Sequence, residues 1–436
     1  MSADLIARGT ASPTSPIMMP TAPSLPEGAT LNAGPPLTQI PGPTRIPDRV
    51  LAAMHQPMPN IYEGALVEMS ERILAELPSI AKTSGQPFVA IANGHGAWEM
   101  ALTNTLSKGD KVLVLESGRF AIGWGEQATL MGCEVEVLTA PERGAVDPAA
   151  VEARLRADTG HRIRAVLVVQ IDTASSVIND IPAIRRAIDA AAHPALYMVD
   201  CIASLGCVEY RMDAWGVDVT VAGSQKGLMV PPGLGFVWAS EKALEAHRSA
   251  DLCTAYWNWG KRMGDGAHYL RYCGTPPVSH LYGLREALNM IAEEGLENIW
   301  ARHAVFAHAV RAAVETWAAP GGIEFNVRAP EARSDAVTTL LSGEIDAGKL
   351  RLLCEQGAGL TLGVGLGQFE GRAFRIGHMG HMNPPQLLGA LATVESALLA
   401  MKAPMGGSGV AAAAAALAPA LASTPLEAGL RRDLDD

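Results

Sequence analysis

The sequence predicts an α/β protein whose larger domain has three layers, with helices on both faces of a mostly parallel, seven-stranded sheet. Apolar runs of strand length occur at 88–92, 111–115, 133–138, 165–170, 195–200, 217–222 and 235–239. Helical patterns separate most of these runs, at 97–106, 122–131, 148–155 and 181–192. Near-continuous apolar strands that alternate with helices are typical of a parallel sheet buried on both faces.

The chain of 436 residues is long enough for two or three units of roughly 150 residues. Helical patterns follow the sheet at 282–293 and 298–317, and residues 321–401 mix short strands with helices. We therefore predict a large domain at 65–289 and a smaller C-terminal α+β domain at 290–402, preceded by an N-terminal arm at 38–64. Residues 1–37, rich in Pro, Ser, Thr and Ala, predict a disordered extension. Residues 403–436 predict a flexible Ala-rich tail whose Ala run could form a loose helix.

Composition narrows the class of protein. The net charge of −11 argues against nucleic acid or an anionic membrane as the main partner. No apolar window is long enough to span a bilayer, and the first residues lack the pattern of a signal peptide. The six cysteines include no C-x-x-C pair, which favours a reducing cytoplasm. His378 and His381 lack a third ligand nearby, so no metal site is predicted.

The residues that follow the strands are the candidates for chemistry, because open α/β sheets bind ligands beyond the carboxyl ends of their strands. Asn-Gly-His-Gly-Ala at 93–97 follows the first strand and opens a helix. Amides at a helix N-terminus form a site for phosphate. A plain tight turn without a ligand would have the same sequence pattern. The second glycine cluster, at 363–367, does not match the dinucleotide fingerprint G-x-G-x-x-G.

Two charged residues follow neighbouring strands. Asp200 ends the fifth strand, and Lys226 follows the sixth in Gly-Ser-Gln-Lys-Gly at 223–227. Taken alone, Asp200 could cap a turn and Lys226 could be solvated. Together they favour a pyridoxal phosphate (PLP) site, since that cofactor needs a lysine for its aldehyde, an acid for its pyridine nitrogen and a phosphate cradle.

Several motifs resemble class V aminotransferases, most closely the serine–glyoxylate and alanine–glyoxylate enzymes. They lie at 200–206, 223–229 and 231–234, with further similarity at 41–44, 104–110, 213–218 and 374–378. The resemblance extends from about residue 41 to residue 399. It implies a PLP-dependent transferase of fold type I, and a homodimer (with a tetramer as an alternative) whose active site lies at the subunit interface.

The resemblance also implies the roles of residues around the cofactor. Lys226 would hold PLP as the internal aldimine, and Asp200 would pair with the pyridine nitrogen. Phe120 would stack on the ring. The phosphate would be bound by Gly94, His95 and Gln225, and the remaining cofactor contacts would be Ser175 and Ile202.

Other roles concern the partner subunit and the substrate. Tyr272 and Thr275 would reach the phosphate from the other subunit. Arg375 would clamp the substrate carboxylate, a task that suits its planar fork, and Gly42 would also contact substrate. In the absence of the family pattern, Phe120 would more simply be a core residue.

The chain departs from the family pattern at 171–176, where it reads Ile-Asp-Thr-Ala-Ser-Ser in place of a sequence close to Asn-Glu-(Ser/Thr)-Ser-Thr-Gly. Ala174 replaces the serine that would bond the cofactor's phenolic oxygen, and Ser175 or Thr173 could compensate. Ser176 replaces a glycine. Residues 60–62, Asn-Ile-Tyr, replace a His-Arg pair at the substrate mouth.

These observations predict a ping-pong aminotransferase acting on a small amino acid, with serine or alanine favoured, and on glyoxylate or pyruvate. Ureidoglycine–glyoxylate and aspartate–glyoxylate transamination are the nearest alternatives. A cysteine desulfurase is disfavoured because Cys354 lies in a helical stretch. A non-enzymatic binding protein is disfavoured because both Lys226 and Asp200 are present.

Overall fold

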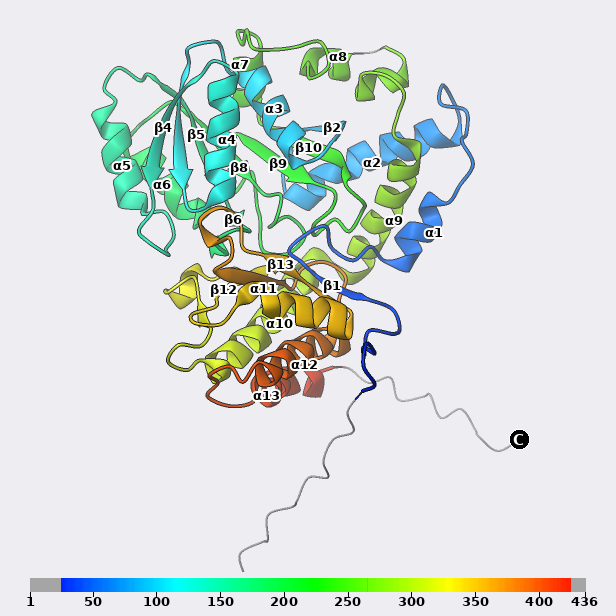
Figure 1. The fold of residues 1–436 in the computed structure, drawn as a ribbon. Coiled ribbons are helices and arrows are strands. Elements are labelled where there is room, and N and C mark those ends of the chain that lie inside the picture. Colours follow the sequence, from blue (N-terminus) through cyan, green and yellow to red (C-terminus); the bar gives the residue numbers. More distant parts are fainter. Residues whose placement is uncertain (1–24, 265, 425–436) are drawn as a thin grey trace, which may run out of the picture.

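The computed structural model describes residues 25–264 and 266–424, which form a large α/β domain and a smaller domain packed below it in Figure 1. The large domain holds a seven-stranded sheet with the strand order β2-β10-β9-β8-β5-β3-β4. Its strands are β2 (Gln86–Ala92), β3 (Lys111–Glu116), β4 (Glu134–Thr139), β5 (Ile163–Val169), β8 (Leu196–Asp200), β9 (Val219–Gly223) and β10 (Gly233–Ala239). All seven predicted strands lie in this sheet, so the predicted fold class is confirmed.

The pairing of the strands follows from their connections. β4, β3, β5, β8 and β9 run parallel, whereas β10 is antiparallel to both β9 and β2. Only residues 224–232 join β9 to β10, and a parallel crossover needs about a dozen residues or more. β10 therefore returns directly beside β9. The loop that connects them carries Lys226 just beyond the carboxyl end of β9.

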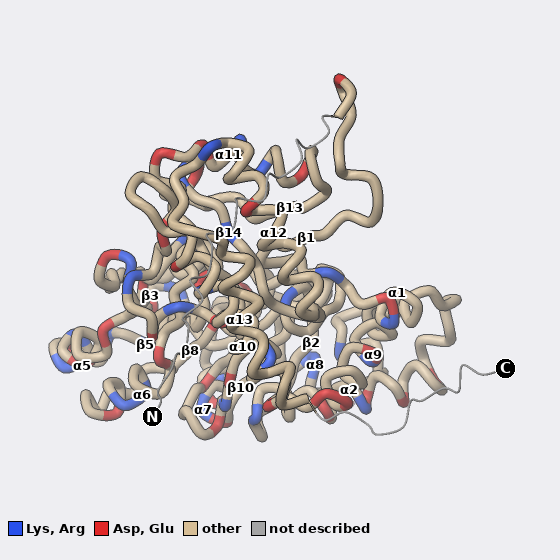
Figure 2. The backbone as a smooth tube through the Cα atoms, turned by 90° about the horizontal axis from the view of Figure 1, so that it is seen from below, with Lys and Arg blue, Asp and Glu red and all other residues tan. Residues whose placement is uncertain are grey.

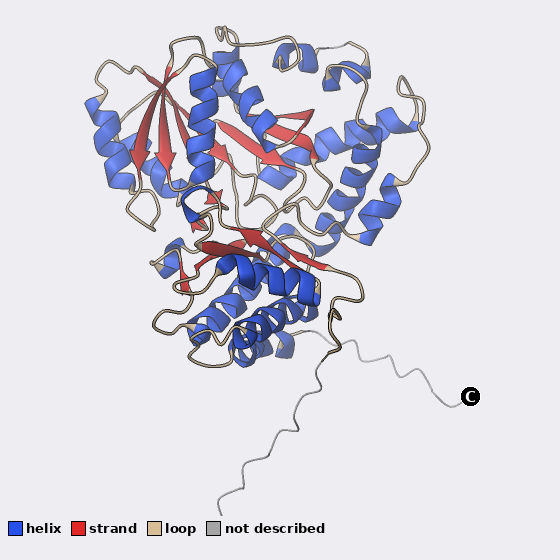
Figure 3. Ribbon diagram, viewed as in Figure 1, coloured by secondary structure: helices blue, strands red, loops and turns tan. Residues whose placement is uncertain are grey.

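Each face of the sheet has its own core, as a strand buried on both sides requires. Leu113 and Leu115 of β3 pack in one cluster, whereas Val112 and Val114 pack in the other. The first cluster includes residues of α2 (Ala65–Ala81), α5 (Pro148–Ala157), α6 (Ile181–Ala190) and α9 (Val278–Glu294). The second includes residues of α3 (Gly94–Thr105), α4 (Arg119–Leu130) and α7 (Glu241–His247). Figure 3 shows these helices on the two sides of the sheet.

Shorter elements complete the large domain. α1 (Asp48–Met54) packs against α9, and α8 (Trp259–Met263) precedes the 3₁₀ helix η1 (His268–Tyr272). A two-stranded hairpin, β6 (Ile171–Asp172) and β7 (Val177–Ile178), lies between the domains. Acidic and basic residues occur together on outer helices such as α5 and α7 (Figure 2). Among the described residues, no helix combines the length and apolarity needed to cross a membrane.

The small domain contains a five-stranded sheet of order β1-β13-β14-β12-β11, in which β1 pairs in parallel with β13 and the other pairs are antiparallel. Its strands are β1 (Leu37–Gln39), β11 (Glu324–Phe325), β12 (Val337–Leu341), β13 (Leu360–Val364) and β14 (Ala373–Gly377). Its helices are α10 (Leu296–Trp317), η2 (Pro330–Ala332), α11 (Ala347–Leu352), η3 (Leu353–Gly357), η4 (Gly367–Phe369), α12 (Pro384–Ala400) and α13 (Gly409–Ala422).

Two predicted boundaries differ from the structure. The boundary at residue 289 lies inside α9, and the chain turns instead at Gly295, whose φ of 83° suits glycine. The predicted extension ends in β1, and the amide of Leu31 donates to the carbonyl of Gly357 at 2.9 Å. Residues 25–36 contain turns but neither helix nor strand, and residues 1–24 of the predicted extension lie outside the described part.

Residues 409–422 of the predicted Ala-rich tail form α13, so the Ala run does form a helix, but the helix is packed against the small domain and is not loose. Ser408 caps this helix, and Gly409, Ala413 and Leu417 are buried against the small-domain core. Alanine is the strongest helix former, and its small side chain allows close packing on α10. At Gly409 a Cβ would lie 2.5 Å from Trp317 Nε1. Residues 425–436 of the predicted tail lie outside the described part of the chain.

Candidate active site

A small cavity of about 110 Å³ lies at the carboxyl ends of β5, β8 and β9. It is small because the Lys226 side chain and residues 41–43 occupy the space between the strand ends and the small domain. The cavity brings together most of the predicted site residues with several unpredicted ones. The lining residues are Gly42, Pro43, Gly94, His95, Trp98, Phe120, Val169, Ile171, Thr173, Asp200, Ile202, Ala203, Gln225 and Lys226.

Asp200 is the last residue of β8 and is 2% exposed. Its Oδ2 accepts a hydrogen bond from Trp98 Nε1 at 2.8 Å, and its Oδ1 accepts one from the amide of Ile202 at 2.6 Å. Burial raises the pKa of Asp200 to about 7, although both hydrogen bonds favour the charged form. A cation placed against this carboxylate would restore its charge, which is the interaction that a pyridinium offers.

Lys226 lies in the loop after β9 and is 9% exposed. Its Nζ donates to the carbonyl oxygen of Pro41. Burial and the positive charge of Arg375 together lower the pKa of Lys226 to about 8, although the negative charge of Asp200 acts in the opposite direction. Near pH 7.5, the neutral fraction of a lysine with this pKa is much larger than that of an exposed lysine. Only the neutral amine can act as a nucleophile or a base.

The N-terminal arm holds the loop that carries Lys226 through two hydrogen bonds from Thr44. The amide of Thr44 donates to the carbonyl of Gln225 at 3.0 Å, and its Oγ1 donates to the carbonyl of Lys226 at 3.1 Å. Gly42 has a φ of 101°, and a Cβ there would overlap the end of the Lys226 side chain. Only glycine fits this contact, so the predicted site residue Gly42 shapes the space around the lysine.

The start of α3 supplies a cradle for an anion. Asn93 caps the helix, with its Oδ1 accepting from the amides of His95 at 3.1 Å and Gly96 at 3.4 Å. A Cβ on Gly94 would overlap the Ile202 side chain, so the backbone approaches closely here. Beside it, Gln225 Oε1 is buried without a hydrogen-bond partner in the described residues. The helix N-terminus fits the phosphate that the sequence predicts, and the Gln225 carboxamide beside it would donate to the phosphate through its Nε2 group.

Phe120 lies in the first turn of α4 and lines the cavity, as predicted. Its amide donates to Oδ2 of the buried Asp172 at 2.8 Å, and the amides of Ala121 and Ala174 also donate to this carboxylate, at 3.2 and 2.9 Å. Asp172 therefore caps α4 and fixes Phe120. A Cβ on Gly118 would overlap the Asp172 carboxylate, so Gly118 permits the cap.

Arg375 lies in the middle of β14 and is 7% exposed. Its Nε donates to the carbonyl of Val364 at 2.6 Å and its Nη1 to the carbonyl of Thr173 at 2.8 Å. Burial lowers its pKa to about 10. Among the described residues it makes no ion pair with a carboxylate. A buried guanidinium held only by carbonyls retains a charge for an anionic ligand.

Ser175 is not part of this cavity, which corrects the predicted cofactor contact. Its Oγ accepts from the amide of Val177 at 3.2 Å and faces a second cavity between the domains. Thr173 lines the active-site cavity instead, because the side chains at 173 and 175 leave the turn of the β6–β7 hairpin in different directions. Ser176 has a φ of 68°, in the left-handed region that favours glycine, and its amide donates to the carbonyl of Asp172 at 2.7 Å.

Tyr272 and Thr275 lie outside the cavity of their own chain. Tyr272 is 1% exposed, and its hydroxyl is hydrogen-bonded to Ser70. Its contact with another subunit's phosphate stays a prediction. Thr275 is exposed, and its contact with a second subunit stays a prediction. Tyr62, from the segment that replaces the family's His-Arg pair, is exposed and packs edge-on against Tyr269.

Sequence reasoning missed Trp98 and Asp172 as site residues, and it offered Thr173 only as an alternative to Ser175. Trp98 lies four residues after Gly94 on the same face of the helix, but that spacing is equally the spacing of a core residue. Asp172 lies three residues after the end of β5, so its position alone made it a candidate. It was not selected because the segment 171–176 differs from the family pattern. Thr173 was an alternative to Ser175, and the sequence did not separate the two.

The fold and the site together define an enzyme of PLP fold type I, with a lysine and a carboxylate at adjacent strand ends and an anion cradle beside them. Residues 89–367 match the family described as aminotransferase class-V, so the chain belongs to the class V aminotransferases. It is 42% identical to a serine–glyoxylate aminotransferase of Methylorubrum extorquens over 398 residues, which cover 87% of this chain and 95% of that protein.

Two further similarities show the range of activities among the relatives. The chain is 40% identical to an L-aspartate–glyoxylate aminotransferase of Paracoccus denitrificans over 377 residues, covering 86% of this chain and 94% of that protein. Its fold matches the crystal structure of pyridoxamine–pyruvate aminotransferase from Mesorhizobium loti with a TM-score of 0.81 at 27% identity, covering 91% of this chain and 99% of that one.

Proposed function

We propose that this chain is a PLP-dependent aminotransferase that moves an amino group from a small amino acid, with serine or alanine favoured, to glyoxylate or pyruvate. The observation that carries the proposal is the joint placement of Lys226 and Asp200 at one cavity, with Arg375 bonded to the carbonyl of Thr173 in its wall. The charges of Asp200 and Arg375 both act on the pKa of Lys226. The relatives that use glyoxylate support the choice of acceptor.

The residues present fit the cofactor. Asp200 would hold the pyridine nitrogen, Phe120 would cover the ring, and the start of α3 with Gln225 would bind the phosphate. When bound, PLP supplies a reactive carbonyl and an electron sink for the substrate Cα.

Substrate binding and proton transfer would be carried out by side chains of the protein. Arg375 would bind the substrate carboxylate and so fix the orientation of the Cα–H bond. Lys226 would remove the proton from Cα and return it in the reverse half-reaction, a role that suits a pKa of about 8. The donor would leave as a 2-oxo acid before the acceptor binds, because one site serves both.

We also propose a cytoplasmic homodimer. The dimer rests on the resemblance to class V enzymes, and the compartment rests on the dispersed cysteines, which are all free in the structure. In this assembly Thr275 would approach the partner subunit's site. Sedimentation velocity of the purified chain would reveal a monomer if the assembly were wrong.

A panel of amino donors tests the proposed reaction. The cofactor-loaded enzyme is mixed with serine, alanine, glycine, aspartate, ureidoglycine or an aminophosphonate, and the visible band of the cofactor is followed in a single turnover. Serine or alanine is expected to deplete the band fastest, and glyoxylate to restore it. A fastest response to aspartate would favour the alternative that the Paracoccus denitrificans relative suggests. No response to any donor would contradict transamination, and a protein that takes up no PLP would favour a binding role.

A further inference from the structure

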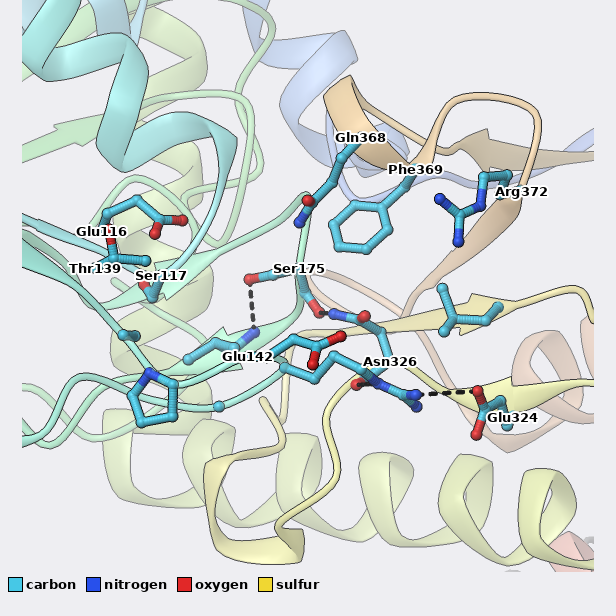
Figure 4. Close-up of a pocket in the computed structure, with 16 residues that line it drawn as sticks. Glu116, Ser117, Thr139, Glu142, Ser175, Glu324, Asn326, Gln368, Phe369 and Arg372 are labelled. Atoms are coloured by element: carbon cyan, nitrogen blue, oxygen red, sulfur yellow. Dashed lines mark hydrogen bonds and ion pairs between the residues drawn. The ribbon is translucent and has the colours of Figure 1, made fainter.

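A second cavity, of about 520 Å³, lies between the two domains and apart from the active-site cavity (Figure 4). One wall comes from the ends of β3 and β4 in the large domain, and the other from β11, the end of β12, η4 and the loop between η4 and β14 in the small domain. The β6–β7 hairpin separates it from the active site: Thr173 faces one cavity and Ser175 the other.

Three charged side chains, of both signs, line this cavity without partners in the described part of the chain. Glu116 and Glu142 stand on the large-domain side and Arg372 on the small-domain side, as Figure 4 shows. Within the described ranges, none of these three side chains makes an ion pair or a hydrogen bond. Arg143 and Glu324 also line the cavity, but they pair with each other at 3.1 Å. The unpaired groups are therefore two carboxylates that face one guanidinium across the space.

Glu116 is the group most in need of a cation. It is half-buried, and both burial and the nearby negative charge of Asp172 raise its pKa. A bound ammonium group would offset both effects, because it favours the charged carboxylate.

Asn326 adds an independent sign of a ligand. It is 1% exposed, and its Nδ2 donates to the carbonyl of Ser175 at 2.8 Å. Its Oδ1 is buried without a partner in the described residues. Buried carboxamide oxygens are rarely left unsatisfied, so this one calls for a hydrogen-bond donor from within the cavity.

We propose that this cavity binds a small zwitterionic amino acid, with its ammonium group toward Glu116, Glu142 and Asn326 and its carboxylate toward Arg372. A plain amine would leave Arg372 unmatched, and a plain carboxylate would meet two like charges. A metal ion is a poorer occupant, since no group of three metal-ligating side chains occurs among the described residues.

The test counts bound glycine by equilibrium dialysis with radiolabelled ligand. The full chain is loaded with cofactor and carries Lys226→Ala, so that turnover does not consume the ligand. We expect one equivalent of glycine per chain that depends on Arg372, in addition to any equivalent bound at the active site. Arg372→Gln or Glu142→Gln is expected to weaken that equivalent about tenfold or more, the usual effect of losing a charge-assisted hydrogen bond.

Both substituted residues are exposed, so the variants are expected to fold, and circular dichroism verifies this. Arg328→Gln is the matched control, because Arg328 is an exposed arginine of the same domain outside the cavity. Methylamine and acetate, each added alone, are expected to compete poorly. Glycine binding that is equal in Arg372→Gln, Glu142→Gln and the control would overturn the proposal, as would equal competition by methylamine. Because the assay measures binding by a chain that cannot transaminate, its outcome is independent of the proposed reaction.

Discussion

The indole Nε1 of Trp98 donates a hydrogen bond to Oδ2 of Asp200 at 2.8 Å, and both side chains are buried. This bond links the helix that begins at the anion cradle to the carboxylate at the end of β8. It fixes the carboxylate and favours its charged form, which is the form that would hold a protonated pyridine nitrogen.

Trp98→Phe removes this bond while keeping an aromatic ring. We expect the affinity for PLP, measured by absorbance titration of the cofactor-free chain, to fall about tenfold or more, since hydrogen bonds to charged groups contribute roughly 1.5–3 kcal/mol. Trp124→Phe is the matched control. Trp124 is equally buried and stacks on Trp98, but its Nε1 has no hydrogen-bond partner in the described residues. Equal losses in the two variants would show that the Trp98–Asp200 bond is irrelevant to cofactor binding.

Asp200→Asn is expected to stabilise the cofactor-free chain at neutral pH. The folded-state pKa of Asp200, about 7, exceeds the ordinary value of 3.8, so the unfolded chain releases this proton first as pH rises. Asp200 therefore lowers stability progressively between about pH 4 and pH 7, by an amount of the order of 4 kcal/mol. Urea unfolding of both chains at pH 5 and pH 7.5 measures the difference. A stability gap that does not widen at the higher pH would contradict the burial of a destabilised carboxylate.

Gly42→Ala is expected to reduce turnover at least 100-fold, an order-of-magnitude figure for misplacing a reacting group. The added methyl would overlap the Lys226 side chain. Gly64→Ala serves as the control, because Gly64 also has a positive φ, of 82°, but a methyl group added there would have no atom within 4 Å. Both variants carry the same kind of backbone strain, so similar activities would place the effect in the backbone and not in the contact with Lys226.

Arg375→Lys separates charge from geometry at the substrate site. Lysine keeps the positive charge but lacks the planar fork, so the KM for the amino donor is expected to rise about tenfold, and Arg375→Gln is expected to raise it about 100-fold. Steady-state kinetics with serine and glyoxylate give both values. A KM that stays constant in Arg375→Gln would mean that another group binds the substrate carboxylate.

Much of the fold could be predicted from the sequence because buried parallel strands are continuous apolar runs, as in β5 and β8. The placement of Asp200 and Lys226 followed from the same pattern, since strand ends mark the site in an open sheet. The packed helix α13 was harder to predict, because a run of alanine and apolar residues has no polar face to show which side is buried.

Three details of the site depended on information that a single sequence lacks. Trp98 reads as a core residue on helical spacing alone, and only its contact with Asp200 gives it a role. The choice between Thr173 and Ser175 depended on the direction of side chains in a four-residue turn. Tyr272 was assigned by its motif, yet its hydroxyl finds Ser70 in its own chain, 202 residues away.

The central claim is that Lys226 carries the cofactor in a working aminotransferase. The most direct measurement loads the chain with PLP, reduces it with borohydride and maps the modified peptide by mass spectrometry. We predict a single phosphopyridoxyl group on Lys226, and none when the chain is first treated with excess serine. A group on another lysine, or no modified lysine in a chain that transaminates, would contradict the account.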